Sequence, residues 1–268
     1  SVDRDWAIRE ILGVGEDFKY ETIANMDWVG RRLVADRFRD RRVFICGDAA
    51  HIWFPMAGYG MNAGIADAMN LSWTLAAYLQ GWGGNTMLDV YQTERQPITE
   101  QVSMFVMNHA YALAAKRKGV PQDIELEGPE GERLRAEVGQ EVYDLNVQQY
   151  CCAGLNFGYF YDKSEVIAYD DEKAPSYSMS QFTSSTVPGC RLPHIWLSGK
   201  RSLYDELGNW FTLVRTDSKI DTRSLEDAAR QRGVPLKVLD ISMEDTEGLY
   251  KQKLILARPD QHIAWRGD

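Results

Sequence analysis

The residues with the clearest chemical potential lie in one segment, where Gly47 and Asp48 follow an apolar run and Gly58, Gly60 and Asn62 come soon afterwards. A carboxylate at the carboxyl edge of a sheet stands where open α/β folds bind ligands, and it can accept hydrogen bonds from sugar-like hydroxyls. Gly58 and Gly60 let a ligand approach backbone that a side chain would block. The alternative is a glycine-rich turn that serves only to pack a strand tightly against a helix.

A strand before Gly47 and a long helix after the second glycine pair are expected to position this segment. The short apolar run within Arg42–Cys46 predicts a buried strand that ends at Gly47-Asp48. The helix, which Gly81 ends, is predicted by residues spaced at i, i+3, i+4 and i+7, namely Ile65, Ala68, Met69, Ser72, Leu75, Ala76 and Leu79. The start of that helix carries unpaired N–H groups and a positive dipole, worth about 0.3–2 kcal/mol to an anion or an electron-rich edge.

The regions around this segment have different patterns. A helix around Ile8–Leu12 is broken at Gly13, and another begins near Thr86 and is expected to kink or restart at Pro97. Residues 118–135 are rich in Gly and Pro and are expected to form a loop at a domain edge.

The carboxyl-terminal third is expected to follow an irregular segment with a small α/β domain. Residues 142–188 are aromatic and irregular, with Tyr159–Tyr161 at their centre. The elements expected beyond them are a strand over 210–215, a helix over 225–232, a strand over 236–241 and a hairpin over 253–257 and 262–265.

Charge and cysteine usage exclude several classes of function. A net charge of −9 argues against nucleic acid, which requires clustered cations. No apolar run approaches the roughly 20 residues of a membrane span. Cys46, Cys151, Cys152 and Cys190 show no CxxC or metal-ligand spacing, so we expect no metal and reduced thiols in a cytoplasmic protein. The start at Ser1, without Met or a signal segment, suggests a piece of a longer protein.

Three stretches taken in order are more specific than a lone glycine pair: Arg42–His51, Pro55–Asn62 and Asp67–Trp73. Together they resemble the second flavin motif of the group A flavoprotein monooxygenases, the 4-hydroxybenzoate and phenol hydroxylase-like family. Residues 188–194, 202–208 and 258–266 resemble the branch of that family with phenol, hydroxyphenylpropionate and polyketide hydroxylases. This resemblance spans most of residues 20–268.

The resemblance implies an α/β fold class. It combines the carboxyl-terminal part of a 4-hydroxybenzoate hydroxylase-like FAD-binding fold (strand, Gly-rich turn, long helices) with a thioredoxin-like α/β domain without CxxC. The implied domains are the end of a substrate-binding middle domain (1–40), the carboxyl-terminal part of the FAD-binding domain (41–120), a connecting irregular segment (121–187) and the thioredoxin-like domain (188–268).

Residue roles also follow from the resemblance. Gly47 and Asp48 would hold the ribityl hydroxyls of FAD, and the backbone of Pro55 would lie near the reactive flavin edge and the substrate. The pyrimidine side of the flavin would meet backbone groups of Gly58, Gly60, Met61 and Asn62. The ring-binding pocket is expected to involve Trp28, Trp53, Phe54 and Met56, for which core packing is the alternative.

Other side chains near the motif are given structural roles or remain open. His51 occupies a structural position in the matched motif and is not expected to act as a base. Arg31 and Arg32 could meet a nicotinamide phosphate or lie on the surface. Tyr159–Tyr161 are expected to pack the small domain against the large one rather than to touch substrate.

The implied activity is hydroxylation of a phenolic or other aromatic substrate with O2, through a flavin C4a-hydroperoxide, with NADH or NADPH as reductant. The G-x-G-x-x-G loop that holds the FAD pyrophosphate in this family is absent from the sequence. The chain alone is therefore expected to be inactive and to need the missing amino-terminal half or a second chain, and a homodimer is possible. The alternatives are a non-catalytic remnant that serves as an interaction module, or a related flavoenzyme that epoxidises or dehydrogenates a polyketide.

Overall fold

A computed structural model describes residues 3–56 and 58–268 and separates into two compact units, Ser1–Gly30 and Arg31–Asp268. The first unit contains helix α1 (Arg4–Leu12), which the Asp3 side chain caps and which ends at Gly13 in the left-handed region at φ 64°. The predicted first helix is confirmed. Ser1, Val2 and Ala57, which belonged to the stretches discussed above, lie outside the described residues.

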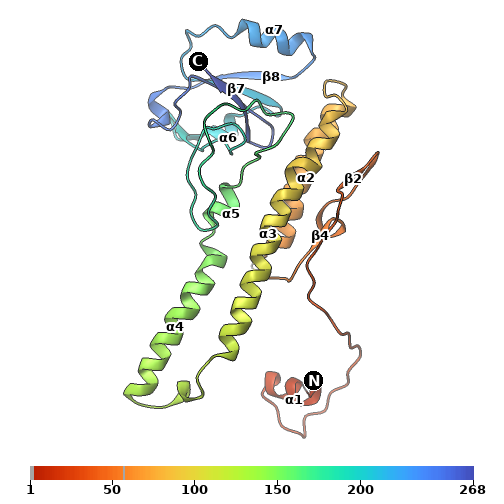
Figure 1. Ribbon diagram of the computed structural model, residues 1–268, viewed down its shortest axis with the longest axis vertical. Helices are drawn as coiled ribbons and strands as arrows, with labels where there is room; N and C mark the ends of the chain where they lie inside the picture. Colours follow the sequence, from red (N-terminus) through yellow and green to blue (C-terminus); the bar gives the residue numbers. More distant parts are fainter. Residues whose placement is uncertain (1–2, 57) are drawn as a thin grey trace. The chain divides into compact units, whose positions relative to one another are not determined.

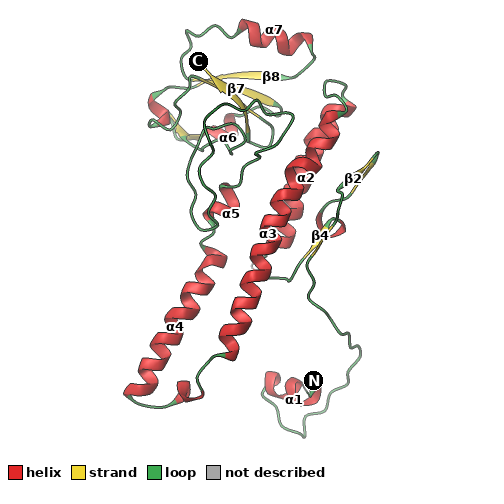
Figure 2. Ribbon diagram, in the orientation of Figure 1, coloured by secondary structure: helices red, strands yellow, loops and turns green. Residues whose placement is uncertain are grey.

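The second unit holds all further elements, with long helices in its first half and a four-stranded sheet near its end (Figures 1 and 2). Up to residue 157 they are β1 (Leu33–Val34), β2 (Arg39–Asp40), β3 (Val43–Phe44), η1 (Gly47–Ala49), β4 (His51–Ile52), α2 (Tyr59–Leu79), α3 (Thr86–Lys118), η2 (Gln122–Glu125), α4 (Pro129–Tyr150) and α5 (Ala153–Phe157). After it they are β5 (Trp196–Leu197), β6 (Arg201–Ser202), α6 (Leu203–Glu206), β7 (Phe211–Arg215), α7 (Arg223–Gln231), β8 (Leu236–Asp240), η3 (Glu244–Thr246), β9 (Leu254–Ala257) and β10 (Ile263–Gly267).

The strand before the Gly-Asp pair is shorter and more exposed than predicted. Its regular part, β3, covers only two residues and pairs antiparallel with β2, while β1 pairs with β4. The strand predicted within Arg42–Cys46 is present, and Phe44, Ile45 and Cys46 pack partly buried against the cluster of Phe38, Ala50 and Tyr91, but Val43 is 65% exposed. The physical reason is that a two-stranded ribbon leaves an edge and a face uncovered unless another layer packs on it.

Helices α2 and α3 pack side by side, and α2 also contacts η1. Helix α2 ends before Gly81, as its pattern predicted. Of the two expected outcomes at Pro97, a kink or a restart, the restart does not occur, because Pro97 lies inside α3, which is one continuous helix of 33 residues. A proline removes one backbone hydrogen bond. Contacts between α3 and α2 continue on both sides of Pro97, through Arg95 with Asp67 and through Ile98 in the cluster of Tyr59.

Helix α4 corrects two predictions, because residues 129–150 were expected to be partly loop and partly irregular. The loop ends at Gly128, and Pro129 takes the first helical position, where its missing N–H costs nothing. Glu130 and Glu132 stand in the first turn, where negative charge favours the helix dipole. The glycines and prolines that suggested a long loop therefore mark the start of a helix.

The predicted carboxyl-terminal α/β arrangement is confirmed. The sheet order is β10-β9-β7-β8, with β7 parallel to β8 and antiparallel to β9, and with β9 antiparallel to β10. Helix α7 connects the two parallel strands. One cluster of buried apolar side chains forms the core of this part: Leu192, Ile195, Leu197, Leu203, Val214, Ile241, Tyr250, Ile255, Ala257 and Ile263.

Candidate functional site

Two glycines bring the Gly-Asp turn onto helix α2. Gly47 opens the short helix η1 with φ 56°, a conformation that favours glycine. A Cβ added to Gly64 on α2 would lie 3.3 Å from the Cα of Gly47. Both residues therefore serve close backbone packing, and this contact places the Gly47-Asp48 turn against α2 at Gly64, five residues after Tyr59.

A buried carboxylate on α2 holds the same turn in place. Asp67 is fully buried and accepts hydrogen bonds from the amide of Gly47 at 3.2 Å and from Nε of Arg95 at 2.9 Å. Its Oδ2 also lies 2.6 Å from Nε2 of His51. Asp67 thus joins the turn, α2 and α3, and it gives His51 the structural role expected of it.

The charge of Asp67 is stabilised by its partners. Burial by itself raises the pKa of this carboxyl, but the hydrogen bond with His51 and the positive charge of Arg95 outweigh that effect and lower its pKa. The ion pair of Asp67 with Arg95 is buried on both sides. A buried pair of this kind maintains local geometry, and losing one partner leaves an uncompensated charge.

Asp48 has a different environment from Asp67. It lies in the first turn of η1 and is exposed, and no hydrogen bond or ion pair of its carboxylate is found among the described residues. A carboxylate held on a rigid turn with its acceptor positions open can bind hydroxyl groups from outside the chain.

The start of α2 provides donors beside this carboxylate. Gly58 is the N-cap residue with φ 71°, and no side chain of the described residues caps the helix there. The first amides of the helix have no intrahelical partner. Nδ2 of Asn62 donates to the carbonyl of Gly58 at 2.9 Å, which closes the turn, and Met61 is 74% exposed.

The surroundings of Gly60 favour a ligand site over a turn that serves only for packing. It lies inside the first turn of α2, and a Cβ built there would meet no described atom within 4 Å. Internal packing therefore gives no reason for glycine at this position. Open space, uncapped amides and a free carboxylate fit the edge and the polyol chain of a flavin.

Two of the predicted substrate residues take part in core packing. Trp53 and Met56 pack against the buried cluster that contains Tyr59, Ile98 and Val102, and the ring of Trp53 stacks on His51 at 4.9 Å. These contacts favour core packing for both.

The other two predicted substrate residues and the proline have separate positions. Pro55 is exposed, beside a tight turn in which Met56 donates its amide to the carbonyl of Phe54 at 2.7 Å. Trp28 belongs to the first unit, whereas Trp53, Phe54 and Met56 belong to the second. Arg32, one of the two candidate phosphate ligands, instead bonds Ser103 at 3.0 Å on α3.

A second buried ion pair was missed by sequence reasoning. Arg258, in the turn between β9 and β10, binds both carboxylate oxygens of Glu94 at 2.5 and 2.7 Å, and both side chains are fully buried. Glu94 also accepts from Nδ2 of Asn70 at 2.7 Å. Arg258 belongs to the stretch 258–266 that carries the family resemblance, but nothing in the sequence pairs it with Glu94.

The aromatic segment also lies at this junction. The ring of Tyr161 is 5.2 Å from the guanidinium carbon of Arg258 and 4.3 Å from the ring of His262. Arg95 lies 5.7 Å from the ring of Tyr159. The prediction that these tyrosines pack the carboxyl-terminal part against the helices is confirmed.

Neither a membrane-spanning helix nor a metal-binding cluster is found among the described residues. None of the helices there is long and apolar enough to cross a membrane. No group of three or more His, Cys, Asp or Glu side chains able to hold a metal ion occurs in residues 3–56 and 58–268.

Comparisons with known proteins agree with this geometry. Residues 8–106 match the family described as FAD binding domain, and residues 185–268 match the family described as aromatic-ring hydroxylase, C-terminal. An FAD-dependent monooxygenase of Penicillium oxalicum is 30% identical over 92% of this chain and 49% of its own length. Phenol 2-monooxygenase of a Pseudomonas species is 31% identical over 97% of this chain and 48% of its own length.

Solved structures are similar over the same extent. The rebeccamycin biosynthetic enzyme RebC with reduced flavin superposes with a TM-score of 0.85 at 31% identity, covering 100% of this chain and 50% of that one. Aklavinone-11 hydroxylase with FAD and aklavinone gives a TM-score of 0.71 at 27% identity, covering 98% of this chain and 48% of that one. The chain therefore spans about half the length of the relatives it matches. It belongs to the family of FAD-binding aromatic-ring hydroxylases.

Proposed function

We propose that this chain is the carboxyl-terminal half of an FAD-dependent monooxygenase that hydroxylates a phenolic or polyketide-derived aromatic ring. The observation that carries the proposal is the open space over Gly60, next to an unpartnered Asp48. Relatives named phenol 2-monooxygenase and aklavinone 12-hydroxylase, both 31% identical, support this substrate class.

Individual residues would have distinct roles toward the cofactor. The carboxylate of Asp48 would accept hydrogen bonds from the ribityl hydroxyls. The backbone of Gly58, Gly60, Met61 and Asn62 would face the pyrimidine edge, where a helix start favours negative charge without reorganisation.

The remaining roles concern the ring edge and the source of electrons. Pro55, with Phe54 beside it, would line the space near the substrate and help to exclude water. Bound FAD would supply the redox chemistry, accepting electrons from NADH or NADPH and inserting one atom of O2 into the ring.

The domain division proposed for the whole protein follows the same assignment. Residues 1–40 would complete a substrate-binding domain, 41–120 the FAD-binding domain, and 121–187 a connecting segment that contains α4. Residues 188–268 would form a thioredoxin-like domain, which the strand order β8-β7-β9-β10 supports. This domain lacks a CxxC pair, so its role would be structural.

The partner of this half would be the amino-terminal half of the same protein or a second chain that carries the phosphate-binding loop. Without a loop and helix start for the pyrophosphate, FAD would be held at one end only. We therefore expect the chain alone to be inactive.

The experiment uses the intact protein and measures FAD affinity by titration of the flavin-free form. Asp48→Ala is expected to weaken binding by about 1–3 kcal/mol, the scale of a lost buried hydrogen bond. Asp36→Ala, at another exposed aspartate, is the matched control and should leave affinity unchanged. Unaltered affinity in Asp48→Ala would contradict the ribityl role. A screen of phenols and polyketide rings for stimulated NAD(P)H oxidation then tests the activity.

A further inference from the structure

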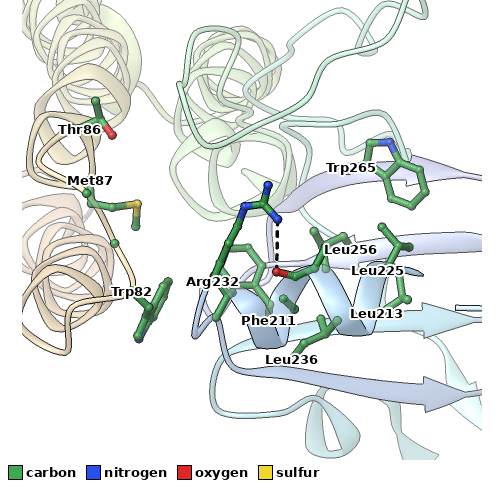
Figure 3. Close-up of a pocket in the computed structure, with 15 residues that line it drawn as sticks. Trp82, Thr86, Met87, Phe211, Leu213, Leu225, Arg232, Leu236, Leu256 and Trp265 are labelled. Atoms are coloured by element: carbon green, nitrogen blue, oxygen red, sulfur yellow. Dashed lines mark hydrogen bonds between the residues drawn. The ribbon is translucent and has the colours of Figure 1, made fainter. Parts of the chain in front are cut away.

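A cavity of about 470 Å³ lies between helix α7, the sheet and the connection from α2 to α3 (Figure 3). Phe211, Leu213 and Leu256 line it from the strands, Trp82 lines it from the connection, and Met87 lines it from the first turn of α3. In Figure 3 Trp82 and Met87 stand on one side and the strand residues on the other. The cavity is thus bounded by two regions that are far apart in the sequence.

This cavity is separate from the proposed flavin site. Its residues in the α2–α3 connection follow the end of α2, whereas Gly60 and Met61 lie in the first turn. A helix of 21 residues spans about 30 Å. A flavin edge bound at the start of α2 therefore leaves this cavity free.

The side chains of helix α7 line this cavity without filling it. Its residues Leu225, Ala228 and Ala229 follow the i, i+3, i+4 spacing of a core-facing stripe, and all three line the cavity. None of the residues of α7 is buried, and Leu225 remains 39% exposed. An apolar stripe that faces a sheet across an open cavity leaves dispersion contacts unmade, which an apolar occupant would restore.

One charged residue completes the stripe. Arg232 is at the i+7 position from Leu225 and lines the same cavity. Its Nη1 donates to the carbonyl of Ala228 at 3.3 Å, drawn as the dashed line in Figure 3. No ion pair of Arg232 is found among the described residues, and of the described side chains that line the cavity it alone carries a charge.

We propose that this cavity is a second binding site, which takes an aromatic anion such as a fused-ring carboxylate. The rings of Trp82 and Phe211, 6.2 Å apart in an edge-to-face arrangement, would contact the planar ring. The guanidinium of Arg232 would bind the carboxylate, a pairing suited to its planar donor geometry. The volume lies within the usual range for small-molecule sites, about 300–1,000 Å³.

The test measures binding of 2-naphthoate and its uncharged analogue 2-naphthalenemethanol to the intact protein by calorimetry. Arg232→Gln is expected to weaken 2-naphthoate about tenfold or more while changing the alcohol less than twofold. Arg230→Gln, on the same helix but paired with Asp227, is the matched control and should change neither. Ala229→Phe, which fills the cavity, should abolish binding of both compounds.

Several outcomes would overturn the proposal. They are the absence of saturable binding, binding that a folded Ala229→Phe retains, and equal affinity for 2-naphthoate in Arg232→Gln and the parent. If Ala229→Phe does not fold, the result for Arg232→Gln decides the test, because Arg232 is exposed and its substitution should not affect folding. A ring bound at the flavin would alter the flavin absorption band and would be insensitive to these substitutions, so the two sites are distinguishable.

Discussion

At the residue scale, three glycines of the motif occupy positions with different physical constraints. Gly47 and Gly64 are required by close approach of two backbones, whereas Gly60 meets nothing that a methyl group would touch. Asp48 and Asp67 differ in the same way, since one is exposed without a partner and the other is buried among three donors. Ligand and packing roles are thus separated within one short stretch.

Gly60→Ala tests this separation. Because a Cβ has room there, we expect folding stability to stay equal or to rise by about 0.5–1 kcal/mol, as for glycine in a helix interior. FAD affinity of the intact protein should fall, because the methyl group occupies space proposed for the flavin. Gly139→Ala in α4, where a Cβ also meets no described atom within 4 Å, should raise stability without changing FAD affinity. Equal FAD affinity in Gly60→Ala and Gly139→Ala would show that Gly60 does not contribute to the flavin site.

The pH dependence of unfolding in the variant Asp67→Asn tests the role of the buried Asp67 carboxylate. The lowered pKa means that Asp67 stabilises the fold above its ordinary value of 3.8, and that this contribution is lost as pH falls through the lower folded value. The variant should lose about 3–5 kcal/mol at neutral pH and show a flatter decline in acid. Urea unfolding from pH 3 to 7 checks both, with exposed Asp36→Asn as control. A parallel decline in both proteins would contradict the assignment.

At the scale of elements, α3 connects the two parts of the second unit through adjacent residues of opposite charge. Arg95 binds Asp67 and secures the Gly-Asp turn, while Glu94 binds Arg258 and secures the turn between β9 and β10. Because neighbouring residues on a helix point about 100° apart, one helix can bind partners on two sides. The pairs therefore set how the carboxyl-terminal sheet sits on the helices.

Glu94→Gln should destabilise the fold by about 3 kcal/mol, because Arg258 is fully buried and would retain only Asp260 as an anionic partner. Asp240→Asn is the matched control. It breaks the ion pair with Arg215, which is half exposed on the Asp240 side, and should cost less than about 1 kcal/mol. Guanidinium unfolding of the two variants measures the difference, and equal losses would show that burial of the pair is unimportant.

At the scale of the whole molecule, an apolar stripe of α2 is exposed among the described residues of the second unit. Met61, Ile65, Met69 and Leu79 are 74%, 59%, 47% and 72% exposed. The buried side of the helix combines apolar residues such as Trp73 and Ala77 with three polar ones whose partners lie within the unit, namely Asp67, Asn70 and Thr74. Contiguous apolar surface of this kind marks an interaction site. Its position on α2 agrees with a chain that spans half of its relatives.

The substitution Ile65→Glu tests whether the proposed missing half of the protein covers the apolar stripe of α2. In the intact protein, burying the charge against the proposed missing half should cost about 2–4 kcal/mol or cause loss of that half. In the 268-residue chain alone, the same change should alter stability by less than about 0.5 kcal/mol, because the side chain is already in water. Ser72→Glu, on the same exposed face, is a milder comparison. Equal changes in stability on Ile65→Glu in the intact protein and in the 268-residue chain would contradict the proposal that another part of the protein covers this stripe.

The sequence by itself determined the local elements and the family. Periodicity located α1, α2 and the strands and helix of the carboxyl-terminal domain, because these patterns depend on near neighbours along the chain. The ordered Gly-Asp, glycine-pair and helix motif sufficed for the flavin assignment. It overestimated the length and burial of β3, and it missed helix α4 over residues 129–150, where glycine and proline signals were read without their tertiary surroundings.

Only the tertiary structure decided which face of α2 is buried, how Asp67 and Glu94 are paired, and that Gly60 has open space beside it. These features depend on atoms that are distant in the sequence, such as Arg258 against Glu94. A periodic stripe states that a helix has an apolar face, but the partner that covers it can lie anywhere in the chain or outside it. The cavity beside α7 has the same origin, because its walls come from segments more than a hundred residues apart.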